Sequence, residues 1–239
     1  MLWHKRVVLW RNHKMGSVFT WVACKLVHTV CYTSPFAYVA NYTNAIKMPI
    51  GIDTDTFKPG ELKPHSILFL GRLDPVKKPE LFLEAVEQLE HRGANFHTNV
   101  YGEPTSGNEE YAQKLKERFA GLKNTSFYSG VRNDETPAIY ASHDVYVNVT
   151  PSGSFDKTIG EAMASGCVVV AANEAVRDAV PDELIVSNDS TETVARSIQY
   201  ALSLSAQERA GVVAKARTYI EREHSLVLLL RRLVGILTS

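Results

Sequence analysis

The sequence of 239 residues has no excess of either charge, since 26 Lys and Arg residues balance 26 Asp and Glu residues. A chain without a net basic field lacks the electrostatic signature of nucleic-acid-binding proteins, so we expect no nucleic-acid partner. Cysteine is also scarce. Cys24, Cys31 and Cys167 are odd in number, lie in apolar stretches and lack the spacing of metal ligands. This pattern indicates buried, reduced thiols and a cytoplasmic location.

Long apolar runs are missing as well. Lys5 and Arg6 are followed by only four apolar residues, so we expect no signal peptide. Residues 18–32 are the most apolar segment, but they contain Lys25 and are too short to span a bilayer. Residues 226–237 are apolar but contain two arginines. We expect them to form a helix that docks on its own protein, with a peripheral position on a membrane surface as the alternative.

What the chain does have is 45% hydrophobic residues, enough for a substantial core. From Ser66 onward, short β-branched runs alternate with segments of helical apolar spacing. The expected strands are 67–70, 96–101, 126–129, 144–149, 167–171 and 184–186, and the expected helices are 79–92, 108–119, 134–142, 157–164 and 191–204. This alternation predicts an α/β fold with a Rossmann-like, doubly wound parallel sheet covered on both faces. Such sheets bind ligands beyond the carboxyl ends of their strands, so functional residues are expected in the loops there.

The first 50 residues follow a different pattern. One strand–helix–strand unit (7–10, 17–27 and 30–33) leads into a connector punctuated by Pro and Gly. A unit this small cannot bury both faces of a sheet, so it looks like the end of another α/β domain. We therefore divide the chain into a partial N-terminal domain (1–48), a connector (49–65), a C-terminal ligand-binding domain (66–225) and a final helix (226–239) that packs back on the N-terminal part.

The loop after the first strand of the C-terminal domain contains two cations near a helix start. Gly71 allows a ligand to approach the backbone, and Arg72 and Lys77 lie at the carboxyl edge of the strand. A guanidinium, an ammonium and a helix N-terminus together suit a diphosphate. The alternative is a surface loop whose basic residues are simply solvated. The chain has neither a Walker A loop nor a Gly-x-Gly-x-x-Gly fingerprint, which counts against kinases and dehydrogenases.

A second cluster occupies residues 150–166, where a Gly/Ser turn follows an apolar strand and a helix begins near Lys157. The exposed amides of residues 155 to 158 would form an anion site at this helix N-terminus. Glu161, one turn further on, would accept hydrogen bonds from both hydroxyls of a ribose. The alternative is that Glu161 is an ordinary acid favoured by the helix dipole.

Five short motifs occur in order along the chain: Gly51-Ile52-Asp53 with Phe57-Lys58-Pro59, Gly71-Arg72-Leu73 with Lys77, Tyr101-Gly102-Glu103-Pro104, Gly130, and Glu161-Ala162-Met163-Ala164-Ser165-Gly166. In these motifs and their order the chain resembles the retaining family 4 (group 1) glycosyltransferases of the GT-B fold, over residues 7 to 239. The first motif is similar to that family's interdomain connector.

The resemblance implies transfer of a hexosyl group from a nucleotide-diphosphate sugar to an unknown sugar, lipid or protein acceptor, with retention at the anomeric carbon. It implies no cofactor and no metal. By the same resemblance, Arg72 and Lys77 bind the diphosphate and stabilise the leaving nucleotide, and His13 lies in the interdomain cleft near the reacting centre. Glu161 corresponds to the acid that holds the ribose. The donor-binding positions that the resemblance implies are Gly71, Gly102, Val131, Arg132, Ser154, Phe155, Asp156, Lys157, Thr158 and Glu161.

The chain departs from the family pattern at two points. Gly153 stands eight residues before Glu161, where the family has a glutamate that contacts the sugar; Asp156 and Lys157 are the candidates to replace that contact. The rest of the family's first domain, on the order of a hundred residues by the usual size of a domain, is absent from the sequence. We therefore expect donor binding with weak or no transfer by this chain alone.

Two other functions stay open. One is a different GT-B enzyme, either a sugar-nucleotide epimerase, which needs further acid/base residues, or a phosphorylase, which needs a pyridoxal lysine and a longer chain. The other is a non-catalytic module that binds a nucleotide sugar. Whichever function holds, the apolar residues around Phe19 and Trp21 are expected to form an exposed patch. Such a patch favours self-association or a partner chain.

Overall fold

The computed structural model describes residues 5–150, 155–187 and 189–238. Its N-terminal part is a small three-stranded parallel sheet with one helix. Strands β1 (Val8–Trp10), β2 (Thr29–Tyr32) and β3 (Ala45–Lys47) lie in the order β1-β2-β3, and α1 (Val18–Leu26) connects the first two. The helix begins at Ser17, whose side chain accepts a hydrogen bond from the Thr20 amide, as expected of a serine N-cap.

This small unit buries only one side of α1. Its core contains Cys24 and Val30, together with residues of the short 3₁₀ helix η1 (Tyr38–Asn41). On the other side of α1, Phe19 is 86% exposed and Trp21 is 51% exposed. The exposed apolar patch expected around these two residues is therefore present.

The C-terminal part is a five-stranded sheet in the order β6-β5-β4-β7-β8, and every neighbouring pair is parallel. Its strands are β4 (Lys63–Leu70), β5 (His97–Tyr101), β6 (Thr125–Tyr128), β7 (His143–Asn148) and β8 (Val168–Ala171). The chain builds outward from β4 to β6 and then returns to place β7 on the other side of β4. The Rossmann-like, doubly wound sheet predicted from the sequence is confirmed, and the carboxyl ends of β4 and β7 lie side by side.

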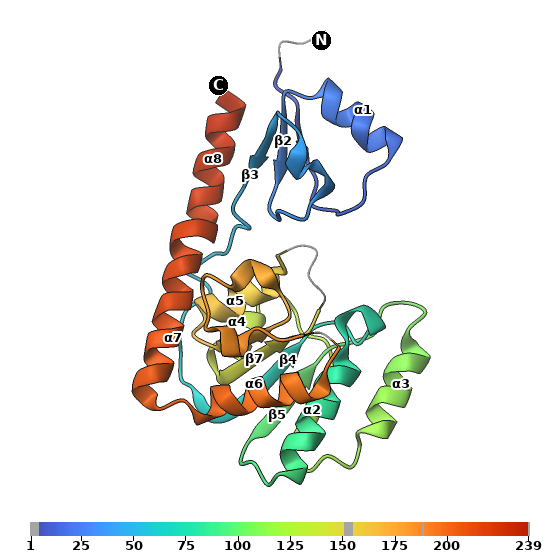
Figure 1. Ribbon diagram of the computed structural model, residues 1–239, viewed down its shortest axis with the longest axis vertical. Coiled ribbons are helices and arrows are strands. Elements are labelled where there is room, and N and C mark those ends of the chain that lie inside the picture. Colours follow the sequence, from blue (N-terminus) through green and yellow to red (C-terminus); the bar gives the residue numbers. More distant parts are fainter. Residues whose placement is uncertain (1–4, 151–154, 188, 239) are drawn as a thin grey trace.

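Helices follow the strands, and α2 and α6 pack against each other (Figure 1). The α-helices of this part are α2 (Pro79–His91), α3 (Glu109–Arg118), α4 (Thr136–Ala141), α5 (Lys157–Ala164), α6 (Thr191–Ser203) and α7 (Ala206–Tyr219). Short 3₁₀ turns are η2 (Pro75–Lys77), η3 (Glu174–Val176) and η4 (Asp182–Leu184). Cys24, Cys31 and Cys167 are buried and free, as predicted.

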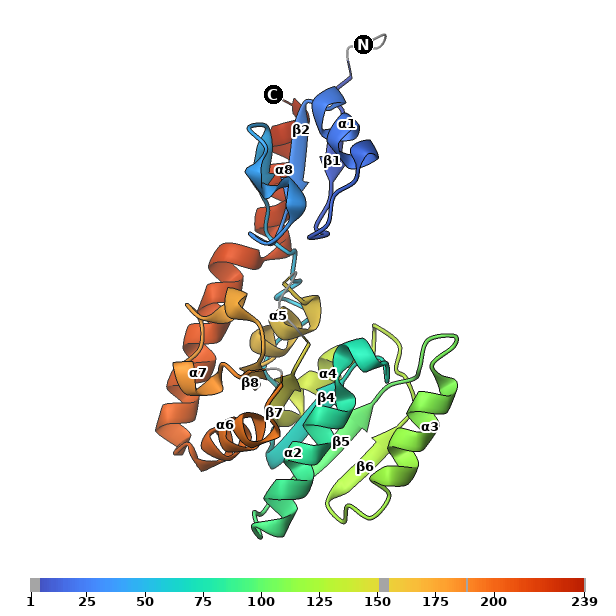
Figure 2. The ribbon, with the colours of Figure 1, turned by 45° about the vertical axis from the view of Figure 1, so that its right-hand side comes forward.

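The connector and the last helix join the two parts. Backbone amides of Gly51 and Ile52 donate to the carbonyl of His224, at the end of the π-helical segment η5 (Ile220–His224). Helix α8 (Leu226–Thr238) then runs alongside the N-terminal sheet, where Arg232 Nη1 donates to the Lys47 carbonyl at 3.3 Å (Figure 2). No helix in the described ranges is long and apolar enough to cross a membrane.

Three expectations about elements need correction. The strand predicted at 184–186 is a 3₁₀ turn followed by a single bridge from Ile185 to Ala171, because Pro181 starts a tight turn immediately before it. The predicted strand–helix–strand unit of the N-terminal domain has a third strand, β3, which was not predicted and which pairs with β2. Helix α7 was not predicted, because its apolar residues do not recur on one face; the capping box of Ser205 and Glu208 fixes its start.

Candidate functional site

The loops after β4 and β5 meet closely at the carboxyl edge of the sheet. The Gly71 amide donates to the Tyr101 carbonyl at 3.1 Å, and a methyl group on Gly102 would overlap the carbonyl oxygen of Gly71. Only glycine therefore fits at position 102 without a backbone shift. A pocket of about 370 Å³ opens between these loops and the loop after β6, and its lining includes Gly71, Arg72, Gly102 and Val131. The structure thus brings four of the predicted residues together.

Arg72 lines this pocket, and its side chain is 56% exposed. Its Nε lies 3.5 Å from Oδ2 of Asp74. The Asp74 carboxylate is buried and accepts hydrogen bonds from the Thr105 amide at 2.9 Å and the Thr105 hydroxyl at 3.0 Å. Because this carboxylate is fixed, it orients the guanidinium while leaving most of its donors available to a ligand.

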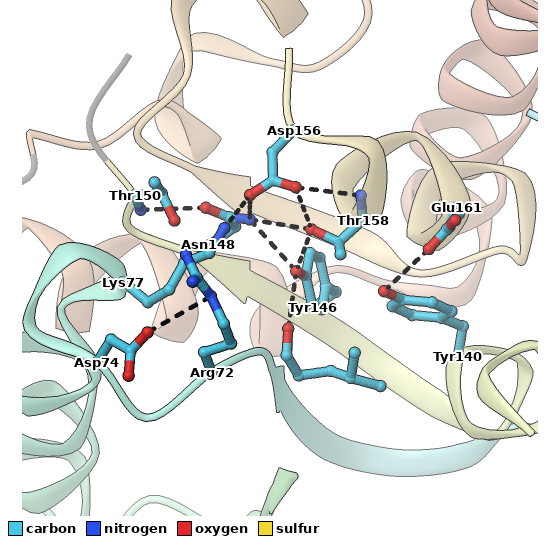
Figure 3. A network of polar contacts seen from close by, with 11 residues as sticks. Arg72, Asp74, Lys77, Tyr140, Tyr146, Asn148, Thr150, Asp156, Thr158 and Glu161 are labelled. Atoms are coloured by element: carbon cyan, nitrogen blue, oxygen red, sulfur yellow. Dashed lines mark hydrogen bonds and ion pairs between the residues drawn. The ribbon is translucent and has the colours of Figure 1, made fainter. Parts of the chain in front are cut away.

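Lys77 is engaged by another residue of the site. Its Nζ lies 2.5 Å from Oδ2 of Asp156, and both side chains are mostly buried (Figure 3). Lys77 follows β4, whereas Asp156 precedes α5, so the two partners are 79 positions apart along the chain. The adjacency of β4 and β7 brings them together.

Asp156 also caps helix α5. Its Oδ1 accepts from the Thr158 amide at 3.4 Å and from the Thr158 hydroxyl at 3.0 Å, and Oδ2 accepts from Asn148 Nδ2 at 3.2 Å. The buried Tyr146 hydroxyl donates to the Thr158 hydroxyl at 2.9 Å. The amides of residues 155 to 158 were expected to be open to an external anion. That expectation is wrong for the Thr158 amide, since a carboxylate of the same loop already accepts from it.

Glu161 lies one turn into α5 and is only 14% exposed. The Tyr140 hydroxyl donates to its Oε2 at 3.5 Å (Figure 3). Lys157 Nζ lies 4.0 Å from Oε1. Burial raises the pKa of the Glu161 carboxyl to about 7, and Lys157 and Tyr140 oppose that rise only in part. A carboxylate that is desolvated and weakly partnered is ready to accept hydrogen bonds from a ligand.

Other predicted residues point elsewhere or cannot be placed. The Phe155 ring is buried and lies 4.9 Å from the His224 ring, so this side chain belongs to the core rather than to an open loop. Arg132 forms a bidentate pair with Asp134 at 3.0 Å and is largely exposed, beside rather than in the pocket lining. Lys157 is 60% exposed, and its contact with the site is the one to Glu161 described above. Ser154 and Gly153 lie outside the described residues.

His13 lies in the loop that follows β1 and is exposed. The Met15 amide lies 3.0 Å from its Nδ1, and the Tyr38 amide donates to its carbonyl. The loop is at the end of the N-terminal sheet that faces the C-terminal part (Figure 2). Its role near the reacting centre stays a prediction.

The residues that support the site were not predicted from the sequence. Asp74, Tyr146 and Asn148 hold Arg72, Thr158 and Asp156 in place. A usable signal was the amide at position 148, which directly follows the apolar residues Val145, Tyr146 and Val147 at the carboxyl end of β7. Within the described ranges no group of three or more His, Cys, Asp or Glu residues could hold a metal ion.

Comparison with known proteins gives the family. The family model "Glycosyl transferases group 1" matches residues 64–203. A D-inositol 3-phosphate glycosyltransferase of Geodermatophilus obscurus is 29% identical over 209 residues, which are 76% of this chain and 46% of that protein. A sulfoquinovosyl transferase of Arabidopsis thaliana is 26% identical over 147 residues, 56% of this chain and 27% of that protein. The chain spans less than half the length of these curated relatives.

Solved structures share the fold. The Anabaena protein HepE, in complex with UDP and glucose, matches with a TM-score of 0.81 and 16% identity over 98% of this chain and 72% of that one. The C-terminal domain of the group 1 glycosyl transferase LpcC from Francisella tularensis matches with a TM-score of 0.64 and 22% identity, over 74% of this chain and all of that domain. The fold is that of GT-B glycosyltransferases, and with the family match over 64–203 the chain belongs to the group 1 glycosyl transferases.

Proposed function

We propose that this chain binds a nucleoside diphosphate sugar, the donor of a retaining glycosyl transfer, at the carboxyl edge of its five-stranded sheet. The observation that carries the proposal is the placement of Arg72, Lys77 and Glu161 along that one edge (Figure 3). Two cations and a weakly partnered carboxylate match the diphosphate and the ribose of one ligand. The family match and the UDP bound by the HepE structure support the same ligand class.

Each residue has a distinct proposed role. Arg72 and Lys77 bind the diphosphate and stabilise the negative charge that develops on it as the sugar departs. Glu161 accepts hydrogen bonds from the ribose hydroxyls. The pocket beside Gly102 and Val131 holds the nucleobase, and its volume of about 370 Å³ is ample for one. His13 approaches the reacting centre from the N-terminal unit.

Calorimetric titration with UDP, GDP and ADP tests the binding step. Arg72→Ala and Lys77→Ala are each expected to weaken binding of the preferred nucleotide by about 1.5–3 kcal/mol, the range for hydrogen bonds to charged groups. Lys114→Ala, at an exposed position on α3, is the matched control and should leave the affinity unchanged. Unaltered affinity in both site variants would place the diphosphate somewhere other than this loop.

The transfer step is proposed to be weak in this chain alone. Gly153 replaces the family glutamate that contacts the sugar, and the small N-terminal sheet offers little surface to hold an acceptor. Holding donor and acceptor together can lower a reaction barrier by roughly 7–11 kcal/mol. Where the acceptor is not held, slow hydrolysis of the donor is expected to be the main reaction. This departure at Gly153 also favours the second candidate, a non-catalytic module that binds a nucleotide sugar. Incubation with radiolabelled UDP-glucose and simple acceptors separates the two candidates. Slow hydrolysis or transfer supports a weak enzyme, the absence of both supports the non-catalytic module, and rapid transfer would refute both.

A further inference from the structure

The ammonium group expected to meet the diphosphate already has an anionic partner in the same chain. Lys77 Nζ and Asp156 Oδ2 are 2.5 Å apart, and the two side chains are only 21% and 18% exposed. A contact of this length between mostly buried groups is a charge-assisted hydrogen bond rather than a loose surface pair. The Asp156 carboxylate therefore stands where a phosphate oxygen of the donor would bind Lys77.

The same carboxylate occupies a second part of the anion site, since it accepts from the Thr158 amide at the start of α5. Asn148 and the Thr158 hydroxyl complete its set of donors. Burial by itself opposes ionisation of Asp156, but Lys77, Asn148 and Thr158 outweigh it, so the pKa of this carboxyl lies below its usual value. Asp156 is thus a fully ionised group that imitates a bound anion.

A diphosphate and this carboxylate cannot both contact Lys77 at hydrogen-bond distance without strong like-charge repulsion in a poorly solvated place. On the basis of the function proposed above, we propose that Asp156 is an internal competitor of the donor: the diphosphate binds by displacing Asp156 from Lys77 and from the start of α5. In the free protein, Asp156 is a positioning residue that holds Lys77 in place and lowers the affinity for nucleotide.

The substitution Asp156→Asn tests this exchange. Asparagine keeps the shape and is as good a helix N-cap as aspartate, so α5 retains its start. Removing the competing charge is expected to raise the affinity for UDP by about tenfold or more, which corresponds to the lower range of a hydrogen bond between charged groups. Asp182→Asn removes a charge from an 80% exposed side chain away from this site and serves as the control for net charge.

The outcomes separate the exchange from the proposed function. Tighter binding in D156N than in the wild type and D182N supports the exchange. Binding that is equal or weaker in D156N overturns the exchange alone and leaves nucleotide binding intact. If neither the wild type nor D156N binds UDP, GDP or ADP, the proposed function is overturned and the exchange with it.

A second measurement needs no substitution at Asp156. The ¹³C shift of its side-chain carboxyl, followed against pH by NMR, should report a pKa below the ordinary value in the free protein and a clearly higher one when UDP saturates it, because Lys77 then contacts phosphate. Lys77→Met should raise the same pKa in the absence of nucleotide. A pKa that stays unchanged on UDP binding would show that the ion pair persists in the complex, which overturns the exchange.

Discussion

Burial of the charged Glu161 carboxylate should lower the free energy of unfolding, and the size of that effect can be measured from its pH dependence. Its carboxyl has a pKa of about 7 in the folded protein, against an ordinary value of 4.5, because it is buried on α5. A rise of about 2.5 pKa units corresponds to roughly 3 kcal/mol at 1.36 kcal/mol per unit. Below pH 4.5 the group is neutral in both the folded and the unfolded chain, and above pH 7 it is charged in both. The raised pKa therefore stabilises the folded state fully below pH 4.5, where Glu161 is protonated, and this stabilisation is lost as pH rises from 4.5 through 7.

Glu161→Gln keeps the shape and removes the titration. Urea unfolding of both proteins at several pH values should show the variant gaining on the wild type by roughly 3 kcal/mol between pH 4.5 and pH 8, an order-of-magnitude figure. Glu110→Gln, at an 82% exposed position on α3, controls for loss of one charge. Titrating groups that do not interact with Glu161 cancel in the comparison. A difference between E161Q and wild type that is the same at pH 5 and pH 8 would refute a buried, raised-pKa carboxyl.

Two further predictions concern binding and association. UDP affinity should fall in E161Q, whereas a 2′,3′-dideoxy nucleotide should bind weakly to both proteins and lose little more in the variant; equal losses for the two ligands in calorimetry would show that Glu161 does not contact the ribose. Light scattering should show self-association of the chain at micromolar concentrations, because Phe19 and Trp21 expose apolar surface on α1, and the double substitution to serine should reduce it. Val234→Ser on the exposed side of α8 is the matched control, and a clean wild-type monomer would contradict this expectation.

Local sequence patterns were enough to predict the class of fold and the place to look for function. Alternating apolar strands and amphipathic helices gave the doubly wound sheet, and helix α5 begins and ends where its pattern indicated. The loop with Gly71 and Arg72 was singled out because a glycine allows a ligand to approach the backbone and an arginine can bind an anion. Neither property depends on the rest of the chain. These are short-range properties, set by backbone preference and by the periodicity of burial.

The contact of the Asp156 carboxylate with Lys77 could be seen only in the tertiary structure. Nothing in the local sequence places Asp156 beside Lys77, since their contact requires β7 to insert next to β4 rather than to continue beyond β6. The raised pKa of Glu161 likewise depends on side chains that cover it from elsewhere in the fold. Strand order and burial result from packing between segments that are distant in sequence. The sequence thus indicated which groups could bind an anion, and only the folded chain decided which of them an internal carboxylate already holds.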